Sequence, residues 1–209
     1  VSKAEAMGRF AVIGPRVVFL DRPGTIQTDA GRLHPLTHTG VGVNIFGDAS
    51  TAQMPDPDSI DFIPGVSMLA SRDFIDHAGL MKEHWFVYIE EIEWQQRRGD
   101  LPFGLVPEAL ILHRAGAAIN AGGEAARAAP FSVYFSSRNM LRFVWAEAPL
   151  KAPATYLLAY YKLWRHWGRG WPQFVAMLRG LHQLPPPQSV RTKLPEEVWQ
   201  RILHPVARA

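Results

Sequence analysis

The 209-residue sequence predicts an α/β fold in which a mostly buried sheet is followed by helices. Short apolar runs fill the first half of the chain, and helical spacing of aromatic and aliphatic residues begins at Pro130. A hydrophobic content of 47%, with 11% aromatic residues, supplies a sizeable core. Because strands come first and helices last, α+β is the alternative class. This composition excludes disordered, collagen-like and disulfide-scaffold proteins.

The predicted strands are apolar runs bounded by turn residues. Residues 30–59 are rich in Gly, His, Thr and Asp, and this composition predicts loops. A bend is expected within the run at 61–70, where Pro64 precedes Gly65. The expected strands are 10–14, 17–20, 61–70, 103–106 and 109–112.

The predicted helices follow start and stop signals as well as periodicity. Ser71 can cap a short helix that Gly79 closes. Gly168 and Gly170 separate a pair of helices, and Pro172 suits the first position of the second one. The expected helices are 2–9, 71–78, 84–96, 130–145, 155–166, 172–181 and 196–203.

Charge divides the chain near residue 150, which predicts a body at 1–150 and a helical extension at 151–209. The extension carries nine basic and two acidic residues, net +7, whereas the body is net −4 in a chain of net +3. Basic residues interleaved with aromatic ones favour an anionic membrane surface or a nucleic acid. The alternative is an amphipathic helix packed on its own domain. Four of the seven tryptophans lie in the extension: Trp164, Trp167, Trp171 and Trp199.

Several chemistries are excluded by what the sequence lacks. Without cysteine there is no thiol catalysis and no cysteinyl zinc site. The absence of cysteine is also compatible with a protein that works in a reducing compartment. No run reaches the ~18 apolar residues that a membrane-spanning helix needs. A Gly-rich phosphate loop, a G-x-S-x-G elbow and an H-E-x-x-H zinc motif are also missing.

The segment that most favours catalysis is HWFVYIEEIEW at residues 84–94, where an apolar run leads directly into Glu90, Glu91 and Glu93. On a helix Glu90 and Glu93 share one face, and Glu91 points elsewhere. A carboxylate at the edge of apolar packing has its charged form disfavoured, which raises its pKa toward the range of a general base. The alternative is a solvated helix face.

Three weaker patterns are candidate ligand sites. His113 ends an apolar strand and could ligate a metal, although a structural histidine is the alternative. The sequence DPD at 56–58 has the spacing of a cation site, but a Pro-rich loop favours an exposed turn. Arg138 and Arg142 share a helix face, where they could hold a diphosphate or pair with a local acid at the surface.

Five stretches, taken in order, resemble the C-terminal half of inverting family-2 glycosyltransferases of the GT-A fold, above all rhamnosyltransferase-like and galactofuranosyltransferase-like enzymes of cell-surface polysaccharide synthesis. GLMKEHWFVYIEEIEW at 79–94 is similar to the family block G-L-hydrophobic-D-E-x-F-F-x-Y-x-E-D-x-D-W. LVPEALILH at 105–113 is similar to V-P-x-A-x-x-x-H. The other stretches are AVIGPR at 11–16 with GTIQ at 24–27, DFIPGVSML at 61–69, and YFSSRN at 134–139.

The resemblance implies the acceptor side of a GT-A fold, with a mixed sheet followed by C-terminal helices. The implied reaction transfers a sugar, with inversion, from a nucleoside-diphosphate sugar to a glycan or lipid-linked acceptor. Glu90 or Glu91 would be the general base, and His113 a ligand of Mg²⁺ or Mn²⁺. A cytoplasmic enzyme, peripheral on the inner face of the plasma membrane and without a nucleic-acid partner, is expected. The implied substrate-binding residues are Gly65, Met68, Glu93, Trp94, Arg138 and Asn139.

Two departures from the family pattern lead to further expectations. The family's E-D-x-D is EEIE at residues 90–93, so two of its acids are one methylene longer here. The family's nucleotide-binding half, which ends in the metal-binding D-x-D, is missing before Val1. The sequence is therefore expected to be a piece of a longer enzyme that alone turns over no sugar nucleotide. The alternatives are a non-catalytic binding or assembly domain derived from a glycosyltransferase, and a metal hydrolase that uses Glu90, Glu91 and His113.

Overall fold

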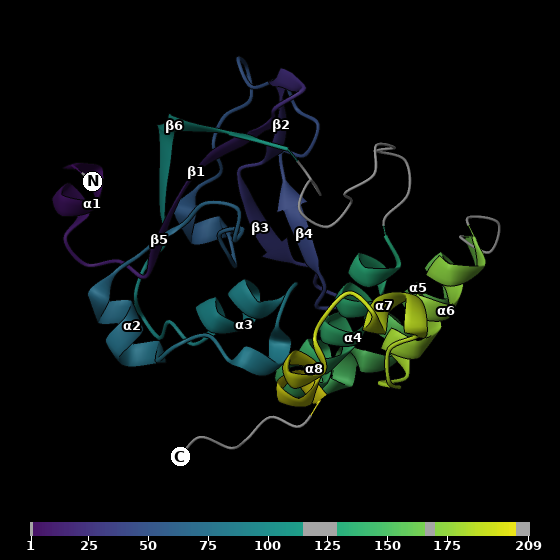
Figure 1. Ribbon diagram of the computed structural model, residues 1–209. Coiled ribbons are helices and arrows are strands. Elements are labelled where there is room, and N and C mark those ends of the chain that lie inside the picture. The colour runs from purple at the N-terminus through teal and green to yellow at the C-terminus, as the bar shows by residue number, and fades with distance from the viewer. Residues whose placement is uncertain (1, 115–128, 166–169, 204–209) are drawn as a thin grey trace. The chain divides into compact units, whose positions relative to one another are not determined.

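The structure is a computed structural model that describes residues 2–114, 129–165 and 170–203 (Figure 1). It has an α/β fold with a mixed sheet, as predicted. The chain divides into two compact units. We call Val1–His34, Gly40–Met81 and Glu91–Ala115 the strand unit, and Pro35–Thr39, Lys82–Glu90 and Gly116–Ala209 the helical unit. This division differs from the boundary expected at residue 150, because the long helix at Pro130–Glu147 packs with the later helices.

The sheet of the strand unit is organised around its first strand, β1. One edge of β1 pairs in parallel with β6, and the other edge pairs antiparallel with β5 near its start and with β2 near its end. A separate antiparallel hairpin joins β3 and β4. The strands are β1 (Val12–Phe19), β2 (Arg22–Thr28), β3 (Ala30–Leu33), β4 (Gly40–Val43), β5 (Leu69–Ala70) and β6 (Gly104–His113).

Two single strands replace pairs of predicted ones: β1 covers the runs at 10–14 and 17–20, and β6 covers those at 103–106 and 109–112. Arg16 is buried inside β1, so a charged residue does not interrupt this strand. The ladder between β1 and β6 skips residues 107–109. Pro107 has no N–H to donate there, which is typical of a bulge.

The region predicted as loops at 30–59 contains the β3–β4 hairpin, and the predicted strand at 61–70 is a strand only in β5. The hairpin depends on close packing of Phe62 on Gly31, since a Cβ added at Gly31 would lie 2.0 Å from the Phe62 ring. Only glycine fits such an approach of ring to backbone.

Helices α1 (Ser2–Met7), α2 (Arg72–Ala78) and α3 (Glu90–Gln96) complete this part of the chain. The predicted cap of α2 is confirmed, because Ser71 Oγ accepts a hydrogen bond from Phe74 N at 3.0 Å and Gly79 ends the helix with a φ of 70°. Phe74 and Trp94 belong to the buried core of the strand unit, which also includes Val12, Ile63 and Leu101.

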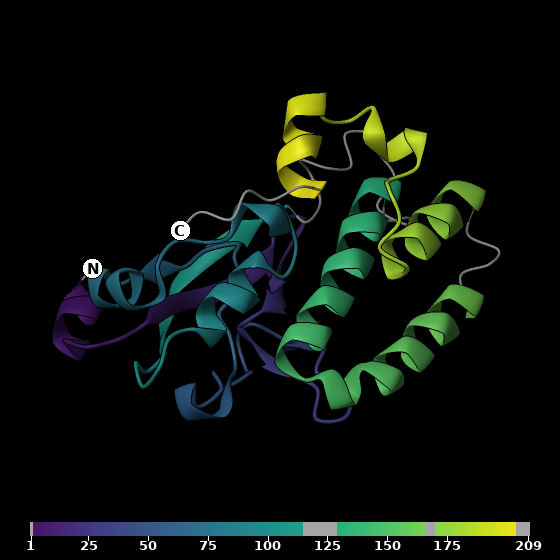
Figure 2. The ribbon, with the colours of Figure 1, turned by 90° about the horizontal axis from the view of Figure 1, so that it is seen from below.

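The helical unit is built on three helices that Figure 2 shows along their lengths, α4 (Pro130–Glu147), α5 (Ala152–Arg165) and α6 (Trp171–Leu181). Their shared core is made of Leu141, Ala159, Leu163, Met177 and Leu181. Two further helices are α7 (Gln188–Arg191) and α8 (Glu196–Leu203). No helix in the described part of the chain is long and apolar enough to cross a membrane. Trp167 and Arg169, which contribute to the predicted basic and aromatic extension, lie outside the described residues.

Candidate functional site

The segment before the carboxylates is not the continuous helix predicted at 84–96. A 3-10 turn at Glu83–Trp85 is followed by positive φ angles at Phe86, Tyr88 and Ile89 of 64°, 65° and 75°. Helix α3 begins only at Glu90. Positive φ is costly for residues with side chains, above all for β-branched ones such as Ile89. The apolar run therefore forms a strained loop, residues 86–89, in front of Glu90.

Asn139 of α4 holds this strained loop. Its side chain is 0% exposed, and the two hydrogens of its Nδ2 are shared among the carbonyl oxygens of Trp85, Val87 and Tyr88, at N···O distances of 2.7, 2.9 and 3.0 Å. Buried backbone carbonyls need hydrogen-bond partners, and the irregular backbone at 85–88 offers none of the helical type. One amide thus replaces the hydrogen bonds that a regular helix would have made.

Arg138, next to Asn139, is 1% exposed and also binds oxygen atoms of the protein. It donates to the carbonyl oxygens of His84 and Ile202 at 3.3 and 3.1 Å and to Asn139 Oδ1 at 2.7 Å. Burial lowers the pKa of Arg138 to about 10, so the guanidinium stays charged at neutral pH. Both side chains are engaged with the protein itself, and substrate contact by Arg138 and Asn139 stays a prediction.

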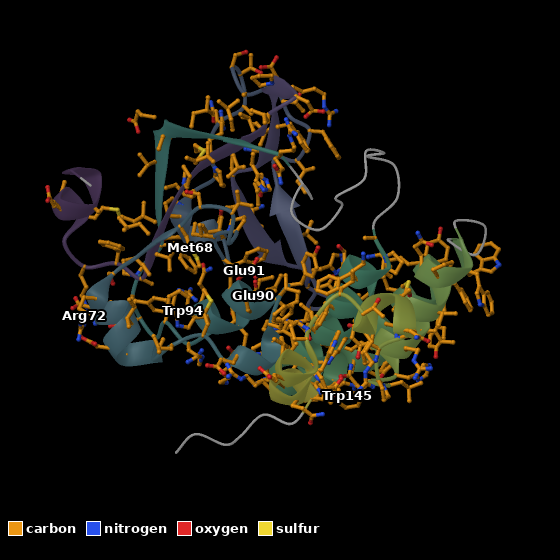
Figure 3. All side chains as sticks on the ribbon, viewed as in Figure 1. Met68, Arg72, Glu90, Glu91, Trp94 and Trp145 are labelled. Atoms are coloured by element: carbon orange, nitrogen blue, oxygen red, sulfur yellow. The ribbon has the colours of Figure 1, made fainter. Side chains whose placement is uncertain are left out.

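Glu90 and Glu91 are half-buried in the first turn of α3 (Figure 3). Along the chain, the division between the two units falls between them. Within the strand unit, Glu91 lies against Gly65, because a Cβ added at Gly65 would be 3.5 Å from Glu91 Cβ and Cγ and 3.6 Å from Cδ. Gly65 is exposed. The structure thus brings together two predicted site residues, Glu91 and Gly65, at an accessible part of the chain.

Gln95 fixes the loop that carries Gly65. Its side chain is 0% exposed, its Oε1 accepts from Ile63 N at 2.7 Å, and its Nε2 donates to Ile63 O at 2.7 Å. The same Nε2 lies 3.8 Å from Met68 Sδ. The amide takes the hydrogen bonds that a neighbouring strand would otherwise make, which explains why residue 63 is outside the sheet. Sequence reasoning missed Gln95, although an amide one turn after Glu91, next to Trp94, was an available signal.

Glu93 and Trp94 lie deeper than Glu91. Buried Glu93 forms an ion pair with Arg97 at 3.2 Å, one turn further along α3. Trp94 Nε1 donates to the carbonyl oxygen of Gly79 at 2.7 Å, and its ring lies 4.6 Å from that of Phe74 between centroids. These contacts anchor α3 in the core, and a role of Glu93 and Trp94 in shaping a substrate pocket stays a prediction.

His113 ends β6, half-buried, with Nδ1 2.9 Å from Gln27 Oε1. An amide oxygen can only accept, so this contact requires a hydrogen on Nδ1. His113 lies opposite Phe19, whereas Leu69 lies opposite Ile13. Six residues of strand separate these positions by roughly 20 Å. His113 is therefore not placed next to Met68, the residue before Leu69.

The described residues contain no group of three or more His, Asp or Glu side chains that could hold a metal ion. His113 offers one donor, so the residues present do not form a Mg²⁺ or Mn²⁺ site, and coordination by His113 stays a prediction. The aspartates at 56–58 form a turn instead: Asp56 Oδ1 accepts from Asp58 N at 3.0 Å and caps the 3-10 helix Pro57–Ser59.

A cavity of about 290 Å³ borders β1 and β6 in the strand unit. Met68, a predicted substrate-binding residue, lines it together with Ser67, Gly14 and Pro15. The first two of these residues belong to the stretch at 61–69 and the last two to the stretch at 11–16. Parts of the chain that resemble the glycosyltransferase family therefore share one cavity wall.

No protein-family model and no curated protein matches the chain. The function of the candidate site is therefore argued from its chemistry and from the five stretches that resemble a family.

Proposed function

We propose that the protein is an inverting glycosyltransferase that moves a sugar from a nucleoside-diphosphate sugar to a glycan or lipid-linked acceptor, with Glu91 as the general base. The observation that carries the proposal is the position of Glu91. Its side chain is half-buried at the start of α3 and lies against exposed Gly65. A carboxylate beside a residue without a side chain leaves room for an acceptor hydroxyl to approach within hydrogen-bond distance.

The packing of the strand unit supports the proposal. The stretch at 11–16 pairs with the stretch at 105–113 through β1 and β6. The stretch at 61–69 is held by Gln95, which directly follows the block at 79–94. Stretches far apart in the sequence thus meet in one unit, as we expect of residues that form a common site.

In the proposed reaction the acceptor oxygen attacks the anomeric carbon on the face opposite the diphosphate. The new C–O bond forms as the bond from that carbon to the diphosphate oxygen breaks, so the configuration inverts. The hydroxyl proton passes to the carboxylate of Glu91, which is ionised before the step and protonated after it. The described residues contribute proton transfer and positioning to this reaction.

Replacing Glu91 by Gln tests the assignment, because the amide keeps the size of the side chain but takes up no proton. In the full gene product, assayed with a panel of nucleoside-diphosphate sugars, we expect kcat to fall by about 10²–10⁴-fold with little change in the KM for the donor. Glu90→Gln is the matched control, and its effect should be smaller.

Two outcomes would contradict this proposal in different ways. If the wild type consumes no sugar nucleotide, the function is wrong, and a non-catalytic binding or assembly domain becomes the better explanation. If the wild type is active and both variants keep near-wild-type kcat, the function stands but the base lies elsewhere.

A further inference from the structure

The outward face of α5 is apolar. Leu157 and Trp164 are 74% and 72% exposed, and Tyr160 and Tyr161 between them are exposed as well. The opposite face of the same helix is buried and consists of Ala152, Thr155, Ala159 and Leu163. We call Leu157, Tyr160, Tyr161 and Trp164 the outer strip. Helical periodicity places these four residues on one face, so they form one surface.

An exposed apolar surface of this kind marks an interaction site in a folded protein. Leu150, 96% exposed, lies in the 3-10 helix just before α5, and exposed Trp171 begins α6. The core of the helical unit is already filled by the buried face of α5. Within the outer strip, Tyr160 also contacts His182 at the end of α6, with 2.5 Å between its hydroxyl oxygen and His182 Nε2, whereas Leu157 and Trp164 are not part of this core.

The stretch of sequence that contains the outer strip is strongly basic. No Asp or Glu occurs in the 48 residues between Glu147 and Glu196, whereas seven basic residues do. Lys162 is exposed on α5 itself. The seven are Lys151, Lys162, Arg165, Arg169, Arg179, Arg191 and Lys193. A partner of this surface is therefore anionic.

We propose that the helical unit binds the surface of an anionic membrane through the outer strip, with α5 lying along the interface. Tyr and Trp rings prefer the level of the headgroups, Leu157 reaches the acyl chains, and flanking Lys and Arg side chains attract anionic lipids. With 14 residues α5 is shorter than the ~20 that a span needs, so it lies on the membrane.

Two other occupants fit the surface less well. A second copy of the chain would bring two strongly basic surfaces together, which like-charge repulsion opposes. A nucleic acid would require basic groups in the centre of the contact, to grip phosphates. Here the centre is formed by one leucine and three aromatic rings. The membrane proposal does not depend on the glycosyltransferase proposal.

The test compares binding of the chain to phosphatidylcholine vesicles with and without phosphatidylglycerol. We expect co-sedimentation with the anionic vesicles alone, weakening as salt is raised. Leu157→Glu places a charge in the outer strip and should reduce binding about tenfold or more. Leu80→Glu is the matched control, because Leu80 is 77% exposed in the strand unit. The affinity of Leu80→Glu for anionic vesicles should stay within about twofold of the wild type, a range that includes the small effect of one added negative charge.

Trp164→Ser provides a second variant at an exposed position, and circular dichroism checks that each variant keeps its helix content. Equal binding to both kinds of vesicle, or no binding to either, would overturn the proposal. So would an unchanged affinity of Leu157→Glu. A dimer that Leu157→Glu dissociates, or tighter binding to a nucleic-acid oligomer than to vesicles at the same salt, would replace the membrane by that partner.

Discussion

Each of the two units contains a buried arginine, and the two guanidinium groups bind different kinds of hydrogen-bond acceptor. Arg16 of the strand unit binds both carboxylate oxygens of Asp29 at 2.8 Å, and it also donates to the carbonyl oxygens of Ala49 and Ala52. Arg138 of the helical unit donates to two carbonyl oxygens and to the amide oxygen of Asn139. The acceptors of Arg138 are thus neutral, whereas Arg16 has a counter-charge.

The pKa values show the consequence. The hydrogen bond with Asp29 raises the pKa of Arg16 in spite of its burial, whereas burial lowers the pKa of Arg138 to about 10. The ion pair joins β1 to Asp29, and the other hydrogen bonds of Arg16 join β1 to the segment at 49–52. The less favourable charge of Arg138 instead connects three separate parts of the helical unit, at residues 84, 138–139 and 202. The comparison teaches that a buried cation can organise irregular backbone even where no carboxylate stabilises it.

The largest effect that can test this comparison comes from removing the counter-charge. Asp29→Ala leaves Arg16 buried without its carboxylate and should lower the free energy of unfolding by about 3–5 kcal/mol. Urea denaturation of the full chain measures the change, and hydrogen exchange of the β1 amides locates it. Asp21→Ala is the control, because Asp21 is exposed and its ion pair with Arg22 is long, with 4.0 Å between Oδ2 and Nε. Equal stability of the two variants would contradict the importance of the Arg16–Asp29 pair.

A smaller effect should follow from removing either buried amide. Asn139→Ala removes the side-chain donor from the carbonyls of Val87 and Tyr88 and leaves that of Trp85 with only the N–H of Val87, so it should cost roughly 2–3 kcal/mol. Hydrogen exchange should rise at residues 85–89 and stay unchanged at residues 61–65. Gln95→Ala should show the reverse pattern, because its partner is Ile63. If both variants raise exchange in the same segments, the two amides do not act as local clamps.

The smallest effect concerns the exposed ion pairs, Arg9–Asp100 in the strand unit and Arg191–Glu196 in the helical unit. Hydrogen bonds from Arg191 and Gln200 lower the pKa of Glu196 below its ordinary 4.5. Since the folded pKa is the lower one, the stabilisation is present above pH 4.5 and is lost as pH falls through the folded value. Arg191→Gln should therefore lower Tm slightly at pH 7.

Arg191→Gln and the wild type should have converging Tm values at low pH, because Glu196 is then protonated in both. Arg9→Gln provides the corresponding measurement in the strand unit, where the hydrogen bond from Arg9 lowers the pKa of Asp100. A Tm difference for Arg191→Gln that persists unchanged at acidic pH would show that Arg191 acts through contacts other than its carboxylate partner.

The candidate site was predictable where its residues are close in sequence, and not where distant residues complete it. Glu90 and Glu91 were expected together, and the structure adds Gly65 beside Glu91. Gln95 and Gln27 were missed, because no local sequence pattern indicates the distant residue to which either amide binds. Their partners, Ile63 and His113, lie 32 and 86 positions away.

The elements that depend on local interactions could be predicted from the sequence. The cap at Ser71, the stop at Gly79 and the apolar periodicity of α4, α6 and α8 are all set within a few residues, so they were predicted correctly. The segregation of acidic and basic residues between body and extension is likewise a property of sequence alone.

Hydrogen bonds between residues far apart in the sequence set the backbone conformation at two places, and these could not be predicted. The run at 84–89 was expected to be helical, yet its carbonyls bind Asn139, more than fifty positions away, and the backbone takes up positive φ. Arg16 remains in β1 because Asp29 neutralises it from outside that strand. In both cases the free energy of satisfying buried polar groups exceeds intrinsic backbone preference, and the partner that satisfies them is known only once the chain has folded.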